Sequence, residues 1–129
     1  MPKRAKILIV DDEPPLLKMM SAYLSRLGYT VTTSSSTEDA WKEVEAAPGG
    51  FDAAVLDGTM PGMSLEELVR QLVRANPAIA VIAASGYAVD MAAVEAAAPG
   101  RAAFLLKPFS PEMLAEAVRR MLGTQEEKL

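Results

Sequence analysis

The sequence predicts an α/β protein with a five-stranded parallel sheet and helices on both faces of that sheet. Five short strand-like segments alternate along the chain with five segments of helical periodicity. Four of the strand-like segments are apolar throughout, which is typical of strands covered on both faces in a parallel sheet. The alternation predicts that each helix lies in a right-handed crossover between two parallel strands.

Length and composition predict one globular domain. The chain has 129 residues, of which 50% are hydrophobic and 23% are charged. We expect a single domain over residues 1–129, with its core at residues 6–123 and flexible ends at residues 1–5 and 124–129.

Composition also excludes several classes of function. With no cysteine and no histidine, the chain lacks a thiolate nucleophile and the commonest general base, so its chemistry must use carboxylates, hydroxyls, lysine and hard cations. The net charge of −4 argues against direct nucleic-acid binding. No apolar run is long enough for membrane insertion, and no signal-peptide pattern follows the charged N-terminus, so we expect a cytoplasmic location.

The first strand and the first helix are predicted at residues 7–28. Ile7 to Val10 is a β-branched apolar run that ends at the acidic pair Asp11-Asp12. The Pro14-Pro15 pair is tolerated in the first turn of a helix. Apolar side chains then recur at helical spacing, at Leu16, Leu17, Met20, Leu24 and Leu27. Gly28 is expected to end this helix at the C′ position.

Two more strands flank the second helix. Tyr29 to Thr33 alternates and is rich in Thr and Val, so it predicts a strand. Thr37 to Ala47 predicts a helix that ends at Pro48 to Gly50. The apolar run Ala53 to Leu56 predicts a buried central strand, which stops at Asp57.

The third helix and the fourth strand follow. Ser64 and Glu67 form a capping-box pattern at the start of a helix that Asn76-Pro77 closes. Its apolar stripe consists of Leu65, Leu68, Val69, Leu72 and Val73. Ile79 to Ala84 predicts the fourth strand, which ends at Ser85.

The last elements are a weak helix, a strand and a strong helix. Val89 to Ala98 is rich in alanine and only weakly amphipathic, so its predicted helix has few large anchors. Ala102 to Leu106 predicts the fifth strand, which ends at Lys107. Ser110 as N-cap followed by proline predicts a final helix over Ser110 to Leu122.

Polar side chains therefore end four parallel strands at one edge of the sheet, where open α/β sheets bind their ligands. They are Asp11, Asp12, Asp57, Ser85 and Lys107. A lone aspartate at a strand end can simply cap a loop, but that interpretation does not explain four polar strand ends. Two carboxylates about 5 Å apart repel by roughly 3 kcal/mol at an effective dielectric constant near 20, so a compensating cation is needed. Lys107 supplies one positive charge, and Mg²⁺ is the natural candidate for the rest.

Four motifs at these strand ends together resemble the receiver domain of response regulators in bacterial two-component signalling. They are I-L-I-V-D-D-E-P (Ile7 to Pro14), V-L-D-G-T-M-P-G (Val55 to Gly62), I-A-A-S-G-Y (Ile82 to Tyr87) and F-L-L-K-P-F (Phe104 to Phe109). The resemblance implies a flavodoxin-like (β/α)5 fold with strand order 2-1-3-4-5. Gly86 is similar to the pattern in receivers of hybrid sensor kinases, and a stand-alone receiver is equally compatible.

The resemblance also implies a role for each site residue. Asp57 would accept a phosphoryl group from a phosphohistidine of a sensor histidine kinase or phosphotransfer domain. Asp12, Asp57 and the backbone carbonyl of Thr59 would ligate Mg²⁺ directly, and Asp11 would act mainly through water. Such a domain is not an enzyme in the ordinary sense, because it catalyses only its own phosphorylation and dephosphorylation.

Further implied roles concern the phosphoryl oxygens and the switch. Ser85 and Lys107 would each contact a phosphoryl oxygen, and the Lys107-Pro108 peptide would be cis. Ser85 and the aromatic residue Phe104 would form the switch. The switch aromatic of the family is often Tyr, so Phe104 either moves without a hydroxyl to donate or is only a core residue.

The surface formed by Val89 to Ala98 and Ser110 to Leu122 is expected to bind a target protein or a second copy of the chain. The alanine-rich helix is the element most easily displaced, because it has few large anchors. Gly58 is expected to loosen the loop directly after Asp57.

Two alternatives remain open from the sequence. Asp57-Gly58-Thr59 resembles part of the D-x-D-G-T motif of haloacid-dehalogenase-type phosphatases, but their nucleophile would fall on Val55, which cannot attack phosphorus. The other alternative is a receiver-like interaction module that is never phosphorylated. It is disfavoured because all five active-site positions keep competent residue types.

Overall fold

The computed structural model describes residues 4–47, 50–87 and 89–126. Its elements alternate as follows: β1 (Lys6–Val10), α1 (Pro14–Arg26), β2 (Thr30–Ser34), α2 (Thr37–Ala46), β3 (Ala53–Asp57), α3 (Leu65–Ala75), β4 (Ala80–Ser85), α4 (Met91–Ala97), β5 (Ala102–Leu106) and α5 (Pro111–Glu126). All strand pairs are parallel, and the strand order is β2-β1-β3-β4-β5. The predicted fold class and strand order are therefore confirmed.

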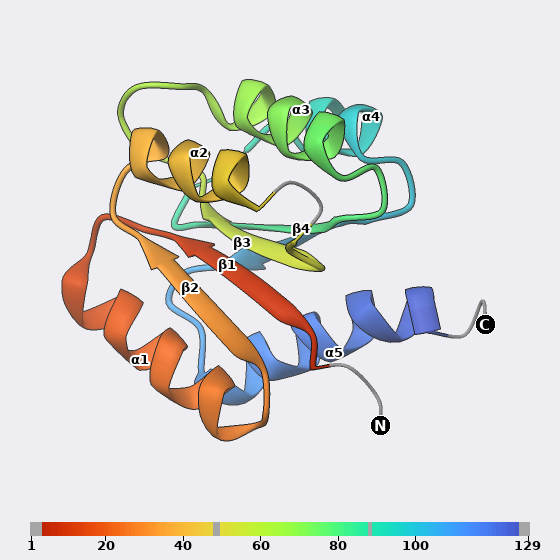
Figure 1. The fold of residues 1–129 in the computed structure, drawn as a ribbon. Coiled ribbons are helices and arrows are strands. Elements are labelled where there is room, and N and C mark those ends of the chain that lie inside the picture. Colours follow the sequence, from red (N-terminus) through yellow and green to blue (C-terminus); the bar gives the residue numbers. More distant parts are fainter. Residues whose placement is uncertain (1–3, 48–49, 88, 127–129) are drawn as a thin grey trace.

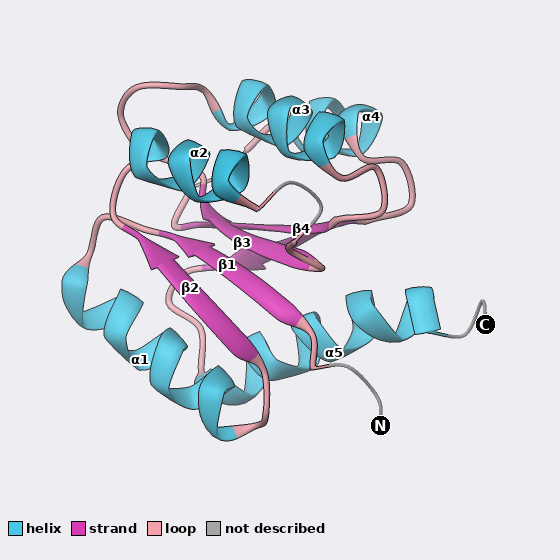
Figure 2. Cartoon of the chain, in the orientation of Figure 1, coloured by secondary structure: helices cyan, strands magenta, loops and turns pink. Residues whose placement is uncertain are grey.

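The sheet lies between two layers of helices (Figure 1). Helices α1 and α5 cover one face, and helices α2, α3 and α4 cover the other. The arrows of β1 and β2 in Figure 2 run side by side in the same direction. Because every pair is parallel, the carboxyl ends of all five strands meet at one edge.

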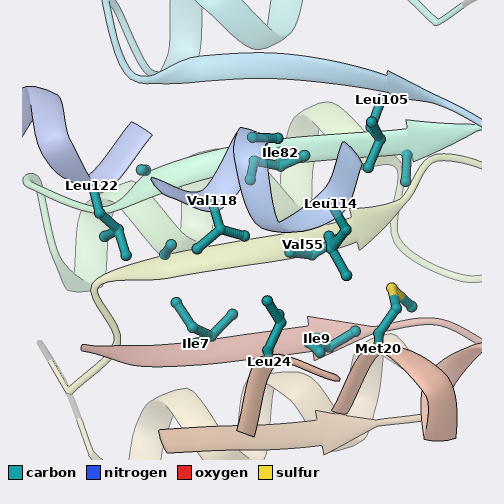
Figure 3. Packing of buried hydrophobic residues seen from close by; sticks show 14 residues of the cluster. Ile7, Ile9, Met20, Leu24, Val55, Ile82, Leu105, Leu114, Val118 and Leu122 are labelled. Carbon is teal, nitrogen blue, oxygen red and sulfur yellow. The ribbon is translucent and has the colours of Figure 1, made fainter. Parts of the chain in front are cut away.

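Each layer has its own hydrophobic core. The core under α1 and α5, shown in Figure 3, joins alternate strand residues such as Ile9 and Val55 to Leu24 and Leu114. The core under α2, α3 and α4 uses the other strand positions, such as Leu8 and Leu56. Burial on both faces explains why these strands are apolar at consecutive positions.

The predicted caps are found at several helix ends. Ser64 Oγ accepts a hydrogen bond from the backbone N–H of Glu67 at 3.2 Å, and Ser110 Oγ accepts one from the N–H of Met113 at 3.1 Å. Gly28 follows α1 with a φ of 102°, which is the left-handed conformation expected at C′.

Some element boundaries differ from the prediction. Helix α4 is shorter than the predicted Val89 to Ala98, and α5 continues past Leu122 to Glu126. Residues 1–3 and 127–129 of the expected flexible ends, and the Pro48-Gly49 turn, lie outside the described residues. In the part of the chain that the structure describes, no helix has the length and apolar character needed to cross a bilayer.

Candidate functional site

The strand register brings the predicted site residues to one edge of the sheet. Val10 of β1 pairs with Leu56 of β3, so the residues that follow them, Asp11 and Asp57, are neighbours. Further along the same edge, Asp57 pairs with Ala84, which precedes Ser85. Ser85 in turn pairs with Leu106 of β5, and Lys107 comes next.

Three carboxylates form a cluster at this edge. One oxygen each of Asp11, Asp12 and Asp57 lies within 4.8 Å of the other two. Asp11 and Asp57 are buried, whereas Asp12 is exposed. Carboxylate oxygens at this spacing are the ligands that a hard divalent cation prefers, so the donor set fits Mg²⁺.

Lys107 is the cation of the cluster. Its Nζ donates a hydrogen bond to Asp11 Oδ2 at 2.9 Å and lies 3.6 Å from Asp57 Oδ1. It also lies 3.6 Å from Glu13 Oε1, at the exposed rim. Glu13 was not among the predicted site residues, although its position directly after Asp11-Asp12 placed it close by. The peptide bond between Lys107 and Pro108 is cis, as predicted.

Burial and neighbouring charges shift the pKa of two members of the cluster. Burial raises the pKa of Asp11, although hydrogen bonds from Lys107 and from the Glu13 backbone act in the opposite direction. Burial also opposes the charge on Lys107. The hydrogen bond to Asp11 and the charges of Asp11, Asp57 and Glu13 outweigh it and raise the pKa of Lys107. Lys107 is therefore charged at neutral pH, whereas the fold opposes ionisation of Asp11 even with these two hydrogen bonds.

Thr59 contacts Asp57 through two groups. Its backbone N–H donates a hydrogen bond to Asp57 Oδ1 at 3.0 Å. Its hydroxyl donates to the same oxygen at 2.9 Å. The family resemblance implies a role for Thr59 through its backbone carbonyl only. The hydroxyl contact was not predicted, because motif spacing does not encode a side-chain rotamer.

Ser85 is fully buried next to the cluster. Its Oγ accepts a hydrogen bond from the backbone N–H of Tyr87 at 3.1 Å. Its backbone carbonyl accepts one from the N–H of Lys107 at 2.8 Å. Ser85 therefore links the loop after β4 to the residue that carries the positive charge.

Gly58, which was expected to loosen the loop after Asp57, is closely surrounded by neighbouring residues. A Cβ at position 58 would lie 2.9 Å from Val89 Cγ1 and 3.2 Å from Ser85 Cβ. Its N–H donates to the carbonyl of Ala84 at 2.8 Å. Glycine is thus needed here for close packing between the two loops.

Phe104 lies on the side of the sheet that α2, α3 and α4 cover. It pairs with Ala83, whose β4 neighbour on the same face is Ser85. Phe104 is partly buried, and neither core cluster includes it among the described residues.

A hollow of about 380 Å³ lies beside the cluster. The hollow is lined by Glu13, Leu16, Thr59, Gly86, Tyr87, Lys107, Pro108 and Phe109. Its lining combines the Lys107 ammonium and the Thr59 hydroxyl with apolar side chains. A molecule that enters this hollow therefore meets both polar and apolar groups.

Comparison with known proteins agrees with this geometry. Residues 7–119 match the family model described as the response regulator receiver domain. The chain belongs to this family. Receiver domains are signalling domains of two-component systems, and they work with histidine kinases, phosphotransfer proteins and effector domains.

Relatives of known sequence carry the receiver in different contexts. The chain is 37% identical over 122 residues to the sensor kinase CckA of Brucella abortus, a match that covers 95% of this chain and 13% of the kinase. It is 32% identical over 129 residues to the chemotaxis protein CheY1 of Helicobacter pylori J99, with 94% of this chain and 99% of CheY1 covered. The chain spans only 24% of the transcriptional regulator NtrC of Rhizobium meliloti.

Solved receiver structures superpose closely on this one. The CheY-like receiver domain protein of Methanospirillum hungatei has a TM-score of 0.86 at 27% identity, covering 98% of this chain and 100% of that one. The receiver domain of the hybrid histidine kinase CckA has a TM-score of 0.79 at 27% identity, covering 92% and 99%. Val55, where a haloacid-dehalogenase-type phosphatase would carry its nucleophile, is buried in the core. Because the chain belongs to the receiver family, the phosphatase alternative is rejected.

Proposed function

We propose that this receiver accepts a phosphoryl group on Asp57. The observation that carries the proposal is the position of the Asp57 carboxylate, which is buried at the end of β3 between two other carboxylates and the Lys107 ammonium. A nucleophilic carboxylate next to a concentrated positive charge is what phosphoryl transfer requires, because the reaction depends on positioning and charge stabilisation.

In the proposed step, an Asp57 oxygen forms a bond to phosphorus while the bond from phosphorus to the donor's imidazole nitrogen breaks. Lys107 stabilises the negative charge on one phosphoryl oxygen with its ammonium, which has three N–H donors and uses one of them on Asp11. Ser85 donates its hydroxyl to another phosphoryl oxygen; its Oγ only accepts from the Tyr87 N–H, so the hydroxyl hydrogen is available.

The acidic cluster would hold Mg²⁺ through Asp12, Asp57 and the backbone carbonyl of Thr59, with Asp11 acting through water. When bound, Mg²⁺ neutralises part of the negative charge on the phosphoryl oxygens. Asp12 is suited to a direct role because it is exposed at the rim. Asp11 is already engaged by Lys107 and by the backbone of Glu13, which fits an indirect role.

The proposed phosphoryl donor is a sensor histidine kinase or a phosphotransfer domain.

The proposed output surface is formed by Val89 to Ala98 and Ser110 to Leu122. Two large apolar side chains are exposed on or beside that surface, Leu106 at the end of β5 and Met113 in α5. Hydrogen exchange with and without beryllofluoride, a phosphoryl mimic, should change protection at this surface. Changes confined to α1 would contradict the assignment of the output surface.

The phosphoacceptor proposal is tested by substitution of Asp57. Asp57→Asn should abolish uptake of labelled phosphate from a small acyl phosphate, because an amide is not a nucleophile. The wild-type protein should lose uptake when Mg²⁺ is removed. The matched control is Asp39→Asn, an exposed position in α2. Wild-type stoichiometry in Asp57→Asn would overturn the assignment, and no uptake by the wild-type protein would favour an interaction module that is never phosphorylated.

A further inference from the structure

The two oxygens of the Asp57 carboxylate have different surroundings. Oδ1 accepts hydrogen bonds from the Thr59 N–H at 3.0 Å and from the Thr59 hydroxyl at 2.9 Å. Lys107 Nζ lies 3.6 Å from the same oxygen. Among the described residues, no hydrogen bond is made to Oδ2. The carboxylate is therefore held by one oxygen only.

This asymmetry bears on which oxygen attacks phosphorus. Hydrogen-bond donors on Oδ1 withdraw electron density from that oxygen. Oδ2 accepts neither of these hydrogen bonds. Rotation of the carboxylate about its bond to Cβ would exchange the two oxygens. Each hydrogen bond to Oδ1 opposes this rotation.

We propose that the Thr59 hydroxyl is a positioning group that fixes the Asp57 carboxylate so that Oδ2 is presented to the incoming phosphoryl group. The inference rests on the phosphoacceptor function proposed above. The backbone N–H is present for almost any residue at position 59, whereas the hydroxyl is what threonine adds. The Thr59 residue is otherwise exposed, so the hydroxyl would have water as an alternative partner.

The step balances without a further reactant. With an acyl phosphate donor, the bond from Oδ2 to phosphorus forms and the bond from phosphorus to the acyl oxygen breaks. The electron pair of the broken bond leaves with the donor's carboxylate, and no proton moves. Oδ1 becomes the carbonyl oxygen of the aspartyl phosphate and can keep both hydrogen bonds from Thr59.

The inference predicts that the hydroxyl, rather than the size of the side chain, determines the rate. Thr59→Val replaces the hydroxyl by a methyl group of similar size, and it should lower the rate constant of phosphoryl uptake at saturating acyl phosphate about tenfold, as expected for a lost hydrogen bond to a charged oxygen. Thr59→Ser keeps a hydroxyl, so it should retain most of the wild-type rate. The matched control is Thr30→Val, an exposed position at the opposite end of the strands, in β2.

Beryllofluoride binding gives a second readout that does not depend on turnover. Thr59→Val should weaken beryllofluoride affinity in proportion to the loss in rate, with an unchanged melting temperature. Wild-type uptake in Thr59→Val, or equal losses in Thr59→Val and Thr59→Ser, would overturn the positioning role. Retention of uptake in Asp57→Asn would instead refute the phosphoacceptor function itself, so the two failures are distinguishable.

Discussion

Lys107 and Asp11 form a hydrogen-bonded ion pair of 2.9 Å, although they are separated by 96 positions in the sequence. Lys107 follows β5 and Asp11 follows β1, and the strands β3 and β4 lie between them in the sheet. The lysine side chain therefore reaches across the ends of two strands, over the position of Asp57. This pair connects the two sides of the site before any phosphoryl group is present.

The first prediction concerns the dependence of stability on pH. Burial raises the pKa of Asp11, so the fold favours its neutral form. The stabilising contribution of a raised pKa is present below the unfolded value and is lost as pH rises through the folded value. At neutral pH without Mg²⁺, Asp11→Asn should therefore have a higher melting temperature than the wild-type protein, and this difference should shrink as the solution is acidified.

Lys107 does not complicate this experiment near neutral pH. Its raised pKa keeps it charged, and its own contribution to stability is lost only in alkaline solution. Asp39→Asn, which changes an exposed carboxylate, is the matched control. A lower melting temperature of Asp11→Asn at neutral pH would mean that the ion pair with Lys107 outweighs burial.

The second prediction separates the roles of the two adjacent aspartates. Asp12→Ala should weaken Mg²⁺ binding by about an order of magnitude, because it removes a proposed direct ligand. Asp11→Ala should have a smaller effect, since Asp11 is already engaged by Lys107. Isothermal titration calorimetry measures both affinities directly. Equal affinities in the two variants and the wild-type protein would contradict this division of roles.

The third prediction concerns the close packing at Gly58. Gly58→Ala should reduce the free energy of unfolding by about 1–3 kcal/mol, the usual effect of overpacking, because the new methyl group would meet Val89 at 2.9 Å. Val89→Ala in the same chain should recover part of this loss. Gly86→Ala is the control, since its Cβ would meet only the Lys107 carbonyl oxygen at 4.0 Å. Chemical denaturation of the variants measures the effect, and equal stabilities of Gly58→Ala and Gly86→Ala would disprove it.

The sequence was sufficient to predict the sheet and the meeting of its strand ends. Apolar runs that end at Asp11, Asp57 and Lys107 determine the strands, and parallel direction then determines that these side chains share an edge. The Thr59 hydroxyl contact and the Gly58 packing were not predictable, because they depend on rotamers and on the approach of the loop at Val89.

Helix boundaries were less predictable for a different reason. Helix α5 continues through Gly123. Glycine inside a helix is less favourable than alanine by only about 1 kcal/mol. That penalty is small enough for neighbouring turns to offset. At α4, Asp90 caps the helix through the N–H of Ala93 at 3.1 Å, so the helix begins at Met91 rather than at Val89.

The last prediction concerns Phe104. In the proposed switch, Ser85 moves toward the phosphoryl group, and the ring at position 104 turns into the space that Ser85 leaves. Exposure of an apolar ring is unfavourable by about 25 cal/mol per Å², so phenylalanine disfavours the outward state. A tyrosine hydroxyl can bond to water or protein in that state, which is worth about 0.5–1.5 kcal/mol. Phe104→Tyr should therefore change the population ratio of the two states by up to about tenfold in favour of the outward state.

Hydrogen exchange of α4 and β5, with and without beryllofluoride, measures this shift. Phe104→Tyr should reduce the change in protection that beryllofluoride causes, because more of the protein stays in the outward state. Phe104→Leu is the control that keeps an apolar side chain without the ring or the hydroxyl. The partial burial of Phe104 leaves the ring room to respond to such a substitution. If the protection change in Phe104→Tyr equals that of the wild-type protein, Phe104 only packs against its neighbours and takes no part in switching.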